Sequence, residues 1–116
     1  KIDVFVFFGY SRNTMSFEEI RKKLTPILKA RGAEYAAVFG SAARGDLKPD
    51  SDVDVLVRFS DDISLLDHIG VAYELGDTVG QKVDLITENS LNKHVAQNVK
   101  KDLKVLYGKG QRQDLL

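Results

Sequence analysis

The 116-residue sequence has no cysteine and no tryptophan, only two histidines and two prolines, and a single methionine. Without cysteine, disulfides and thiolate metal sites are excluded. Two histidines are too few for a zinc site built mainly from imidazole groups. No apolar run reaches membrane-spanning length, so we expect no membrane partner and a cytoplasmic location.

The sequence also lacks an excess of charge of either sign, because 17 basic residues balance 17 acidic ones. A protein that grips a nucleic-acid backbone usually carries a basic field, so we expect no direct nucleic-acid binding. A nucleotide enzyme is compatible with this composition because it needs only local charge. The length suits one domain with its own core.

Hydrophobic periodicity predicts alternating helices and strands in the order α-β-α-β-α-β-α. In the long central helix, the expected apolar positions are Leu65, Leu66, Ile69, Ala72, Tyr73 and Leu75. Pro26 implies a kink or break in the first helix. The predicted helices span about 17–31, 41–44, 64–79 and 91–106, and the predicted strands span about 35–39, 53–59 and 82–87.

These elements predict an α/β (α+β) domain with a small mixed β-sheet and helices packed mainly on one face. The helix between the strands at Val53 and Val83 is a crossover, which makes these strands parallel. The strand that ends at Phe39 runs antiparallel to the strand that begins near Asp52, if both serve one ligand.

The predicted domain spans 15–108, with a flexible tail over 109–116 and an N-terminal extension over 1–14. Met15 is followed by a Ser16-x-x-Glu19 capping box, which predicts a helix start. Two explanations of 1–14 stay open. The natural start is Met15, or the apolar residues 2–8 add a strand at a sheet edge.

A pair of aspartates, Asp52 and Asp54, is the first candidate site. Side chains on a strand alternate, so both carboxylates point to one face, roughly 6–7 Å apart. Magnesium prefers such oxygen ligands together with substrate phosphates. The alternative is a polar strand entry, because aspartates are common near turns.

A small-residue turn, Gly40-Ser41, follows the strand that ends at Phe39. Glycine allows the backbone to approach phosphate, and the next short helix offers N–H groups to an anion. Ser41 adds a hydroxyl and could cap that helix, and Arg44 could reach phosphate oxygens. The alternatives are an ordinary turn with a helix cap, and an arginine that pairs with Asp46 or Asp50.

Asp84 is the third acidic candidate, in the otherwise apolar stretch Val83-Asp84-Leu85-Ile86. Burial of a lone carboxylate is unfavourable unless it is paired or binds a metal. Beside Asp52 and Asp54 it would complete a cluster whose pKa values rise without metal and which could hold two magnesium ions. The alternative is the exposed face of an edge strand.

The spacing Gly40-Ser41, ten residues, Asp52-x-Asp54 resembles the signature of the DNA polymerase β-like nucleotidyltransferase superfamily. The longer run from Gly40 to Val57, together with the strand around Asp84, is similar to its minimal nucleotidyltransferase (MNT) branch. The segment 103–108 also resembles, weakly, the end of the branch's last helix. The resemblance covers about 17–108.

The resemblance implies a polymerase β-like fold and an active enzyme. Gly40 and Ser41 would hold the triphosphate, and Asp52 and Asp54 would bind two Mg²⁺ ions. Asp84 would bind the catalytic metal and help to deprotonate the attacking hydroxyl. ATP would donate AMP to a hydroxyl of a partner protein, with a HEPN-domain toxin as that partner and this chain as its antitoxin.

Three functions stay open at this point. The chain transfers AMP to a protein, transfers it to a small-molecule hydroxyl, or neutralises a partner by contact alone. A catalytic core this small leaves few residues for acceptor binding, which favours a protein partner or a homodimer. For Arg58 we keep a place in the site open. We expect His68 and His94 to be surface or boundary residues, and Tyr73 and Tyr107 to be packing residues.

Overall fold

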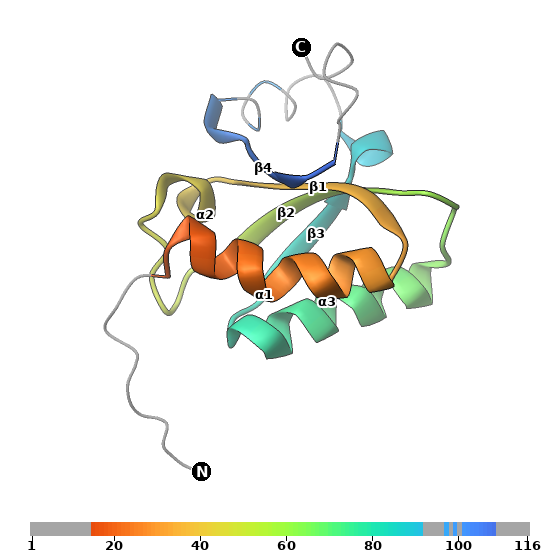
Figure 1. Cartoon of the computed structure of the whole chain (residues 1–116), viewed down its shortest axis with the longest axis horizontal. Helices are drawn as coiled ribbons and strands as arrows, with labels where there is room; N and C mark the ends of the chain where they lie inside the picture. Colours follow the sequence, from red (N-terminus) through yellow and green to blue (C-terminus); the bar gives the residue numbers. More distant parts are fainter. Residues whose placement is uncertain (1–14, 92–96, 98, 100, 109–116) are drawn as a thin grey trace.

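The computed structural model describes residues 15–91, 97, 99 and 101–108. Its elements alternate as the periodicity predicts, up to the last one (Figure 1). The helices are α1 (Phe17–Ala30), α2 (Ser41–Arg44) and α3 (Leu65–Val79), with a 3₁₀ turn η1 (Glu88–Ser90). The strands are β1 (Ala33–Phe39), β2 (Val53–Phe59), β3 (Val83–Thr87) and β4 (Lys104–Tyr107).

The sheet is mixed, with strand order β3-β2-β1-β4. β1 is antiparallel to β2 and β4, while β2 and β3 are parallel, as a helical crossover requires. The predicted antiparallel and parallel pairs are therefore both confirmed. β3 is an edge strand, and this position is important for the site described below.

The helices α1 and α3 cover one face of the sheet, which confirms the predicted arrangement (Figure 1). Alternate strand residues, such as Val53, Val55 and Val57, point into this core. The opposite face carries a second cluster around Tyr35 and Leu56. The first core also includes three α1 and three α3 side chains: Ile20, Leu24, Leu28, Val71, Leu75 and Val79.

α1 begins as its sequence predicts. The Ser16 hydroxyl accepts from the Glu19 amide at 3.1 Å, and the Glu19 carboxylate accepts from the Ser16 amide at 2.9 Å. The predicted break at Pro26 is wrong, because one helix continues through it. Pro26 and Lys22 are both exposed, so water can satisfy the carbonyl that loses its helical partner.

The predicted last helix is wrong at its C-terminal end. Lys104–Tyr107 is strand β4, which pairs with β1 at Ala36↔Tyr107 and Ala37↔Val105. The free edge of β1 supplies backbone partners that a helix would not use. Much of the remaining predicted helix, including His94, lies outside the described residues, as do 1–14 and 109–116.

The apolar face assigned to α3 is also wrong in part. Leu65, Leu66 and Tyr73 are exposed, and Ile69 is 41% exposed. Leu75 is buried as predicted, and Val71 and Val79 take the other buried positions, because α3 carries apolar residues on two sides and the sheet covers only one. In the described part of the chain, no helix is both long enough and apolar enough to cross a membrane.

Candidate active site

The centre of the site is Asp54, the second residue of β2. In the sheet it lies opposite Phe39 of β1 on one side and opposite Asp84 of β3 on the other. Strand alternation points Asp54 away from the face where Val53 and Val55 pack against the helices. The in-register pairing of β2 with β3 gives Asp84 the same orientation. The structure therefore brings these two predicted residues together.

The Asp54 carboxyl group is electrostatically unfavourable in its charged form. Its pKa is raised to about 6, first by partial burial and then by the negative charges of Asp84 and Asp52. This agrees with the expectation that clustered carboxylates raise pKa values without a metal. All three predicted acids thus belong to one electrostatic cluster.

Asp84 itself is exposed at the edge of the sheet. This is one of the alternatives that the sequence left open, the exposed face of an edge strand, because no described strand pairs with the outer side of β3. Asp52 is also exposed and lies 4.0 Å from the Lys82 ammonium group, so this ion pair is weak. Asp54 is the acid of the three that is partly buried.

The turn after β1 fits tightly against Asp54. Gly40 has a φ of +69°, and a Cβ at this position would lie 2.9 Å from Asp54 Oδ2. A side chain there would displace the carboxylate, so the site requires glycine for space as well as for conformation. Gly40 is the N-cap of α2, and Ser41 is its first residue. Ser41 is therefore not the cap that the sequence suggested, and it directly follows the glycine that lies against Asp54.

Arg44 does not point to the carboxylates. Its guanidinium group lies 2.9 Å from Asp102 and 3.4 Å from Asp46. The charge of Asp46 is the main cause that raises the arginine pKa. The pairing with Asp46 is one of the alternatives that the sequence left open, and Asp102 is a partner that it did not indicate.

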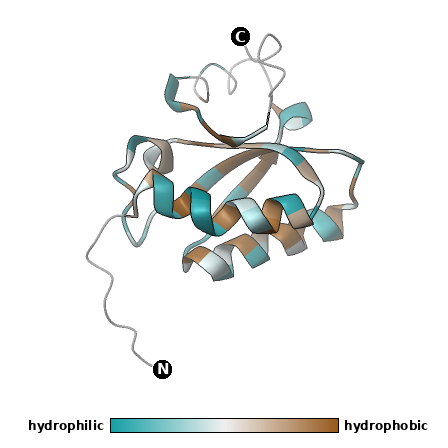
Figure 2. Ribbon diagram, in the orientation of Figure 1, coloured by the Kyte–Doolittle hydropathy of each residue, from teal (hydrophilic) through white to brown (hydrophobic). Residues whose placement is uncertain are grey.

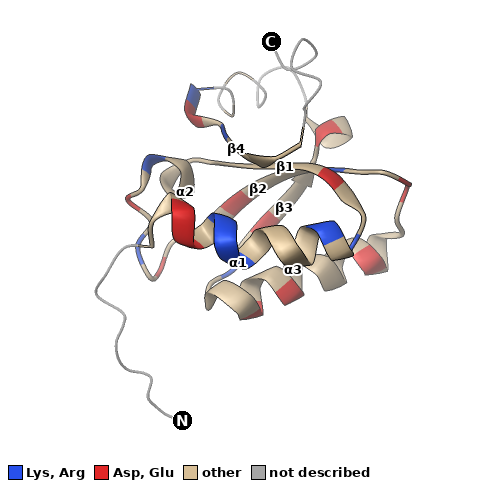
Figure 3. Cartoon of the chain, viewed as in Figure 1, with Lys and Arg blue, Asp and Glu red and all other residues tan. Residues whose placement is uncertain are grey.

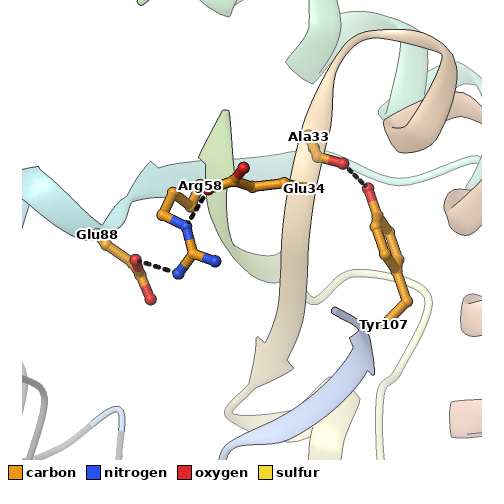
Figure 4. A network of polar contacts seen from close by, with 5 residues as sticks. All are labelled: Ala33, Glu34, Arg58, Glu88 and Tyr107. Carbon is orange, nitrogen blue, oxygen red and sulfur yellow. Dashed lines mark hydrogen bonds and ion pairs between the residues drawn. The ribbon is translucent and has the colours of Figure 1, made fainter. Parts of the chain in front are cut away.

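Arg58 belongs to a different network, shown in Figure 4. It donates to Glu34 at 2.6 Å and to Glu88 at 3.2 Å, so it joins β1, β2 and η1 rather than the carboxylate cluster. Tyr107, in the same view, donates its hydroxyl to the Ala33 carbonyl. His68 bonds to the Leu85 carbonyl at 2.7 Å, which supports its structural role.

Gln81 is a site-supporting residue that the sequence analysis missed. Its side-chain amide donates to the Lys48 carbonyl at 2.8 Å and to the Ser51 carbonyl at 2.6 Å. The Val53 amide also donates to the Lys82 carbonyl at 2.9 Å. These bonds tie the loop before Asp52 to the start of β3. No local sequence signal marks a glutamine that bonds to carbonyls about thirty positions away.

Metal binding can be tested against the donor set. Within residues 15–91, 97, 99 and 101–108, no three histidine, cysteine or carboxylate side chains converge as a ready-made cage. The donors near Asp54 are all carboxylate oxygens, and their charges repel one another. An oxygen-only, anionic set of this kind fits a hard divalent cation such as Mg²⁺, which brings waters and substrate phosphates as its other ligands.

Comparison with protein families gives one model match, to the family described as "Polymerase beta, Nucleotidyltransferase", over residues 22–112. A protein of Methanocaldococcus jannaschii, named as a candidate protein adenylyltransferase, is 44% identical over 78 residues, covering 67% of this chain and 84% of its own. The protein adenylyltransferase MntA of Thermococcus cleftensis is 38% identical over 93 residues, covering 77% and 94%.

Solved structures show the same likeness. A toxin–antitoxin complex crystallised with AMP-PNP contains a chain with a TM-score of 0.70 and 25% identity, covering 82% of this chain and 78% of that one. A complex described as the tri-AMPylated Shewanella oneidensis HEPN toxin with its MNT antitoxin matches with a TM-score of 0.66 and 22% identity. It covers 85% of this chain and 78% of its own, and shows the same fold.

Proposed function

The chain belongs to the polymerase β nucleotidyltransferase family, in its minimal nucleotidyltransferase branch, and we propose that it transfers AMP from ATP to a hydroxyl group of a partner protein. The partner we propose is a HEPN-domain toxin, for which this chain is the antitoxin. The named adenylyltransferases and the toxin–antitoxin complexes among its relatives support this choice.

The observation that carries the proposal is the position of Asp54 between the Gly40 turn and Asp84. A transferase of this kind must hold a triphosphate and orient an acceptor oxygen at one place. In this arrangement Gly40 and Ser41 bind the phosphates through the backbone and the serine hydroxyl. Asp52, Asp54 and Asp84 lie beside them and hold the magnesium ions.

The proposed reaction is an in-line displacement at the α-phosphorus of ATP. The acceptor oxygen forms a bond to this phosphorus, the bond to the bridging oxygen of the β-phosphate breaks, and pyrophosphate leaves. Asp84 accepts the proton of the acceptor hydroxyl. Mg²⁺ held by Asp52, Asp54 and Asp84 would supply positive charge to stabilise the attacking and leaving oxygens.

Arg44 has a proposed role at the edge of this site. It is exposed and paired with Asp46 and Asp102, which are themselves at least partly exposed. Exposed ion pairs are weak, so the guanidinium group can leave them for a phosphate, which it binds more strongly. A change of Arg44 to Gln is therefore expected to weaken ATP binding.

Intact-mass spectrometry tests the function. The chain is incubated with ATP, Mg²⁺ and the protein encoded next to its gene, once that protein is found to contain a HEPN domain. We expect the HEPN protein to gain the mass of an adenylyl group, and the Asp54→Asn variant to give no gain. A well-folded pair that shows no gain would contradict the proposal.

Two further measurements separate the alternatives. Release of pyrophosphate with a free small-molecule acceptor and no protein would point to a small-molecule transferase. If an Asp52→Asn, Asp54→Asn double variant still neutralises the HEPN protein, the chain acts by contact alone.

A further inference from the structure

The exposed side of α3 carries an apolar stripe that the fold leaves uncovered. We define the α3 stripe as Leu65, Leu66, Ile69 and Tyr73. Leu66 is 80% exposed and Tyr73 is 73% exposed. Figure 2 shows hydrophobic residues on α3 as well as on the sheet behind it. Four large apolar side chains on one helix are more than the scattered exposure that a monomer surface normally shows.

A groove of about 780 Å³ runs between this stripe and the edge strand β3. Ile69 and Tyr73 line it from α3, and Val83, Asp84 and Leu85 line it from β3. Asp84, the proposed proton acceptor, lines the groove from the edge strand, and strand alternation turns its carboxylate to the face of the sheet opposite α3. A partner held in the groove would pass around the β3 edge to bring its neighbouring segment to the carboxylate cluster.

The α3 side of the groove is acidic, although Glu74 pairs with Arg31 at 2.8 Å and Lys82 lines the groove on its β3 side. There is no lysine or arginine anywhere in 60–81, and Figure 3 shows only acidic charges on α3. The acids of this stretch are Asp61, Asp62, Asp67, Glu74 and Asp77. An apolar stripe with an acidic rim complements an apolar surface with a basic rim. It repels an anionic membrane, and it also repels the same helix of a second copy.

The groove fits a helix better than a strand. Leu65, Ile69 and Tyr73 follow one another at four-residue intervals, which is the ridge that packs into the groove of another helix. The Leu85 carbonyl is already bonded to His68 at 2.7 Å. An added strand would find the ladder at the β3 edge interrupted at this residue.

We propose that the groove between α3 and β3 docks the acceptor protein, through an amphipathic helix whose apolar face is flanked by lysine or arginine residues. This inference rests on the proposed function, because it names the surface that brings the acceptor to the site. Docking recruits the helix, and the acceptor hydroxyl comes from the segment next to it.

Two model peptides test the docking surface on the full chain. Both are 18-residue amphipathic helices with the same leucine face, flanked by lysine in one and by glutamate in the other. Fluorescence anisotropy is expected to show at least tenfold tighter binding of the lysine peptide. Amide NMR shifts on binding should concentrate at the α3 stripe and β3. Equal binding of both peptides, or shifts confined to α1 or β4, would overturn the proposal.

Matched variants locate the contact. The double change Leu66→Asn, Tyr73→Asn should weaken binding of the lysine peptide at least tenfold. Val105→Asn, which changes an exposed apolar residue on β4, should leave this binding unchanged. Circular dichroism checks that each variant is folded. Binding unaffected by the α3 changes would overturn the proposal. So would stripe-dependent self-association in sedimentation, or stripe-dependent binding to anionic phosphatidylserine vesicles.

The docking surface and the chemistry can fail separately. The Leu66→Asn, Tyr73→Asn variant should keep ATP affinity but adenylylate the HEPN protein at least tenfold more slowly at low acceptor concentration. The Asp52→Asn, Asp54→Asn variant should still bind the lysine peptide but should no longer transfer AMP. If the stripe variant transfers AMP at the normal rate, the docking proposal is wrong and the function stands. If the wild type binds the peptide but never transfers AMP, the function is wrong.

Discussion

At the residue scale, Gly40 is the residue with the least freedom to change. Gly40→Ala places a Cβ 2.9 Å from Asp54 Oδ2 and also forces alanine to a φ of +69°. We expect a loss of about 2 kcal/mol in the free energy of unfolding, mainly from the backbone, because the φ and ψ of Gly40 (69° and −145°) lie in a region that is essentially limited to glycine, whereas the Asp54 carboxylate can rotate away. Urea unfolding measures the stability, and calorimetry should show at least a tenfold loss of ATP affinity.

Gly45 offers a comparison for ATP binding. It has a positive φ, +84°, in the left-handed helical region, and a Cβ there meets nothing within 4 Å. Gly45→Ala should therefore lose only the backbone term, about 1 kcal/mol, and should keep its ATP affinity. If the two variants behave alike, the contact with Asp54 is unimportant.

The raised pKa of Asp54 predicts that the stability of the folded protein decreases as pH rises. Its pKa is raised from 3.8 to about 6, so the folded state holds a proton that the unfolded chain releases at lower pH. Stability from this group therefore falls as pH rises from about 4 to 6, and the penalty is complete above 6. Asp54→Asn should stabilise the metal-free protein by about 1 kcal/mol at pH 8, a value reduced for partial exposure.

Thermal unfolding at pH 4 and pH 8 checks this prediction. The advantage of Asp54→Asn should be much smaller at pH 4, where the folded-state carboxyl group is largely protonated. Mg²⁺ at pH 8 should raise the melting temperature of the wild type more than that of the variant. An advantage of equal size at both pH values would show that charge is not its cause.

At the element scale, two glycines of α3 should respond in opposite directions to alanine. A Cβ on Gly70 meets nothing within 4 Å, whereas one on Gly76 would lie 2.8 Å from the Gln81 carbonyl oxygen. Gly70→Ala should stabilise the protein by about 0.5–1 kcal/mol through helix propensity. Gly76→Ala should destabilise it by about 1–3 kcal/mol, because α3 must move away from the turn that precedes β3. Urea unfolding of both variants decides the matter.

Local patterns predict some of these elements well and others poorly. The alternation in β2 and the crossover through α3 are local, and together they predict the parallel pairing that places Asp54 beside Asp84. β4 depends on the free edge of β1, which is remote in sequence, so its four residues read as the end of a helix. α3 has two apolar sides, and the position of the sheet determines which of them is buried.

The candidate site divides in the same way. The Gly40 turn and the aspartates follow from spacing and strand alternation. The partners of Arg44 and the bonds of Gln81 depend on loops and segments that tertiary structure brings together. The exposure of Asp84 stayed one of two alternatives, because an edge strand and a central strand of this composition look alike in sequence.

At the scale of the whole molecule, we propose that the folding unit is 15–108. β4 completes it, because Leu106 is buried and the Tyr107 hydroxyl bonds to the Ala33 carbonyl at 2.5 Å. A chain of 15–108 should match the full chain in stability within about 0.5 kcal/mol, because it retains every buried residue of the described core.

A shorter chain, 15–103, is the matching test. It lacks β4, so it should lose at least about 2 kcal/mol from the burial of Leu106 alone and expose the edge of β1. Urea unfolding and light scattering measure the two effects. If 15–103 is as stable as 15–108, β4 is not part of the folding unit.

The register between β2 and β3 also limits which changes in chain length this fold can accept. Val53 pairs with Val83 and Asp54 with Asp84, and the turn from Gly80 to Lys82 sets that alignment. Loss of one residue from this turn would move Asp84 to the helix-covered side and turn Val83 and Leu85 outward. Many substitutions elsewhere leave the carboxylates facing each other, but this single deletion separates them. We therefore expect insertions and deletions to accumulate in other loops of this domain and to be absent from this turn.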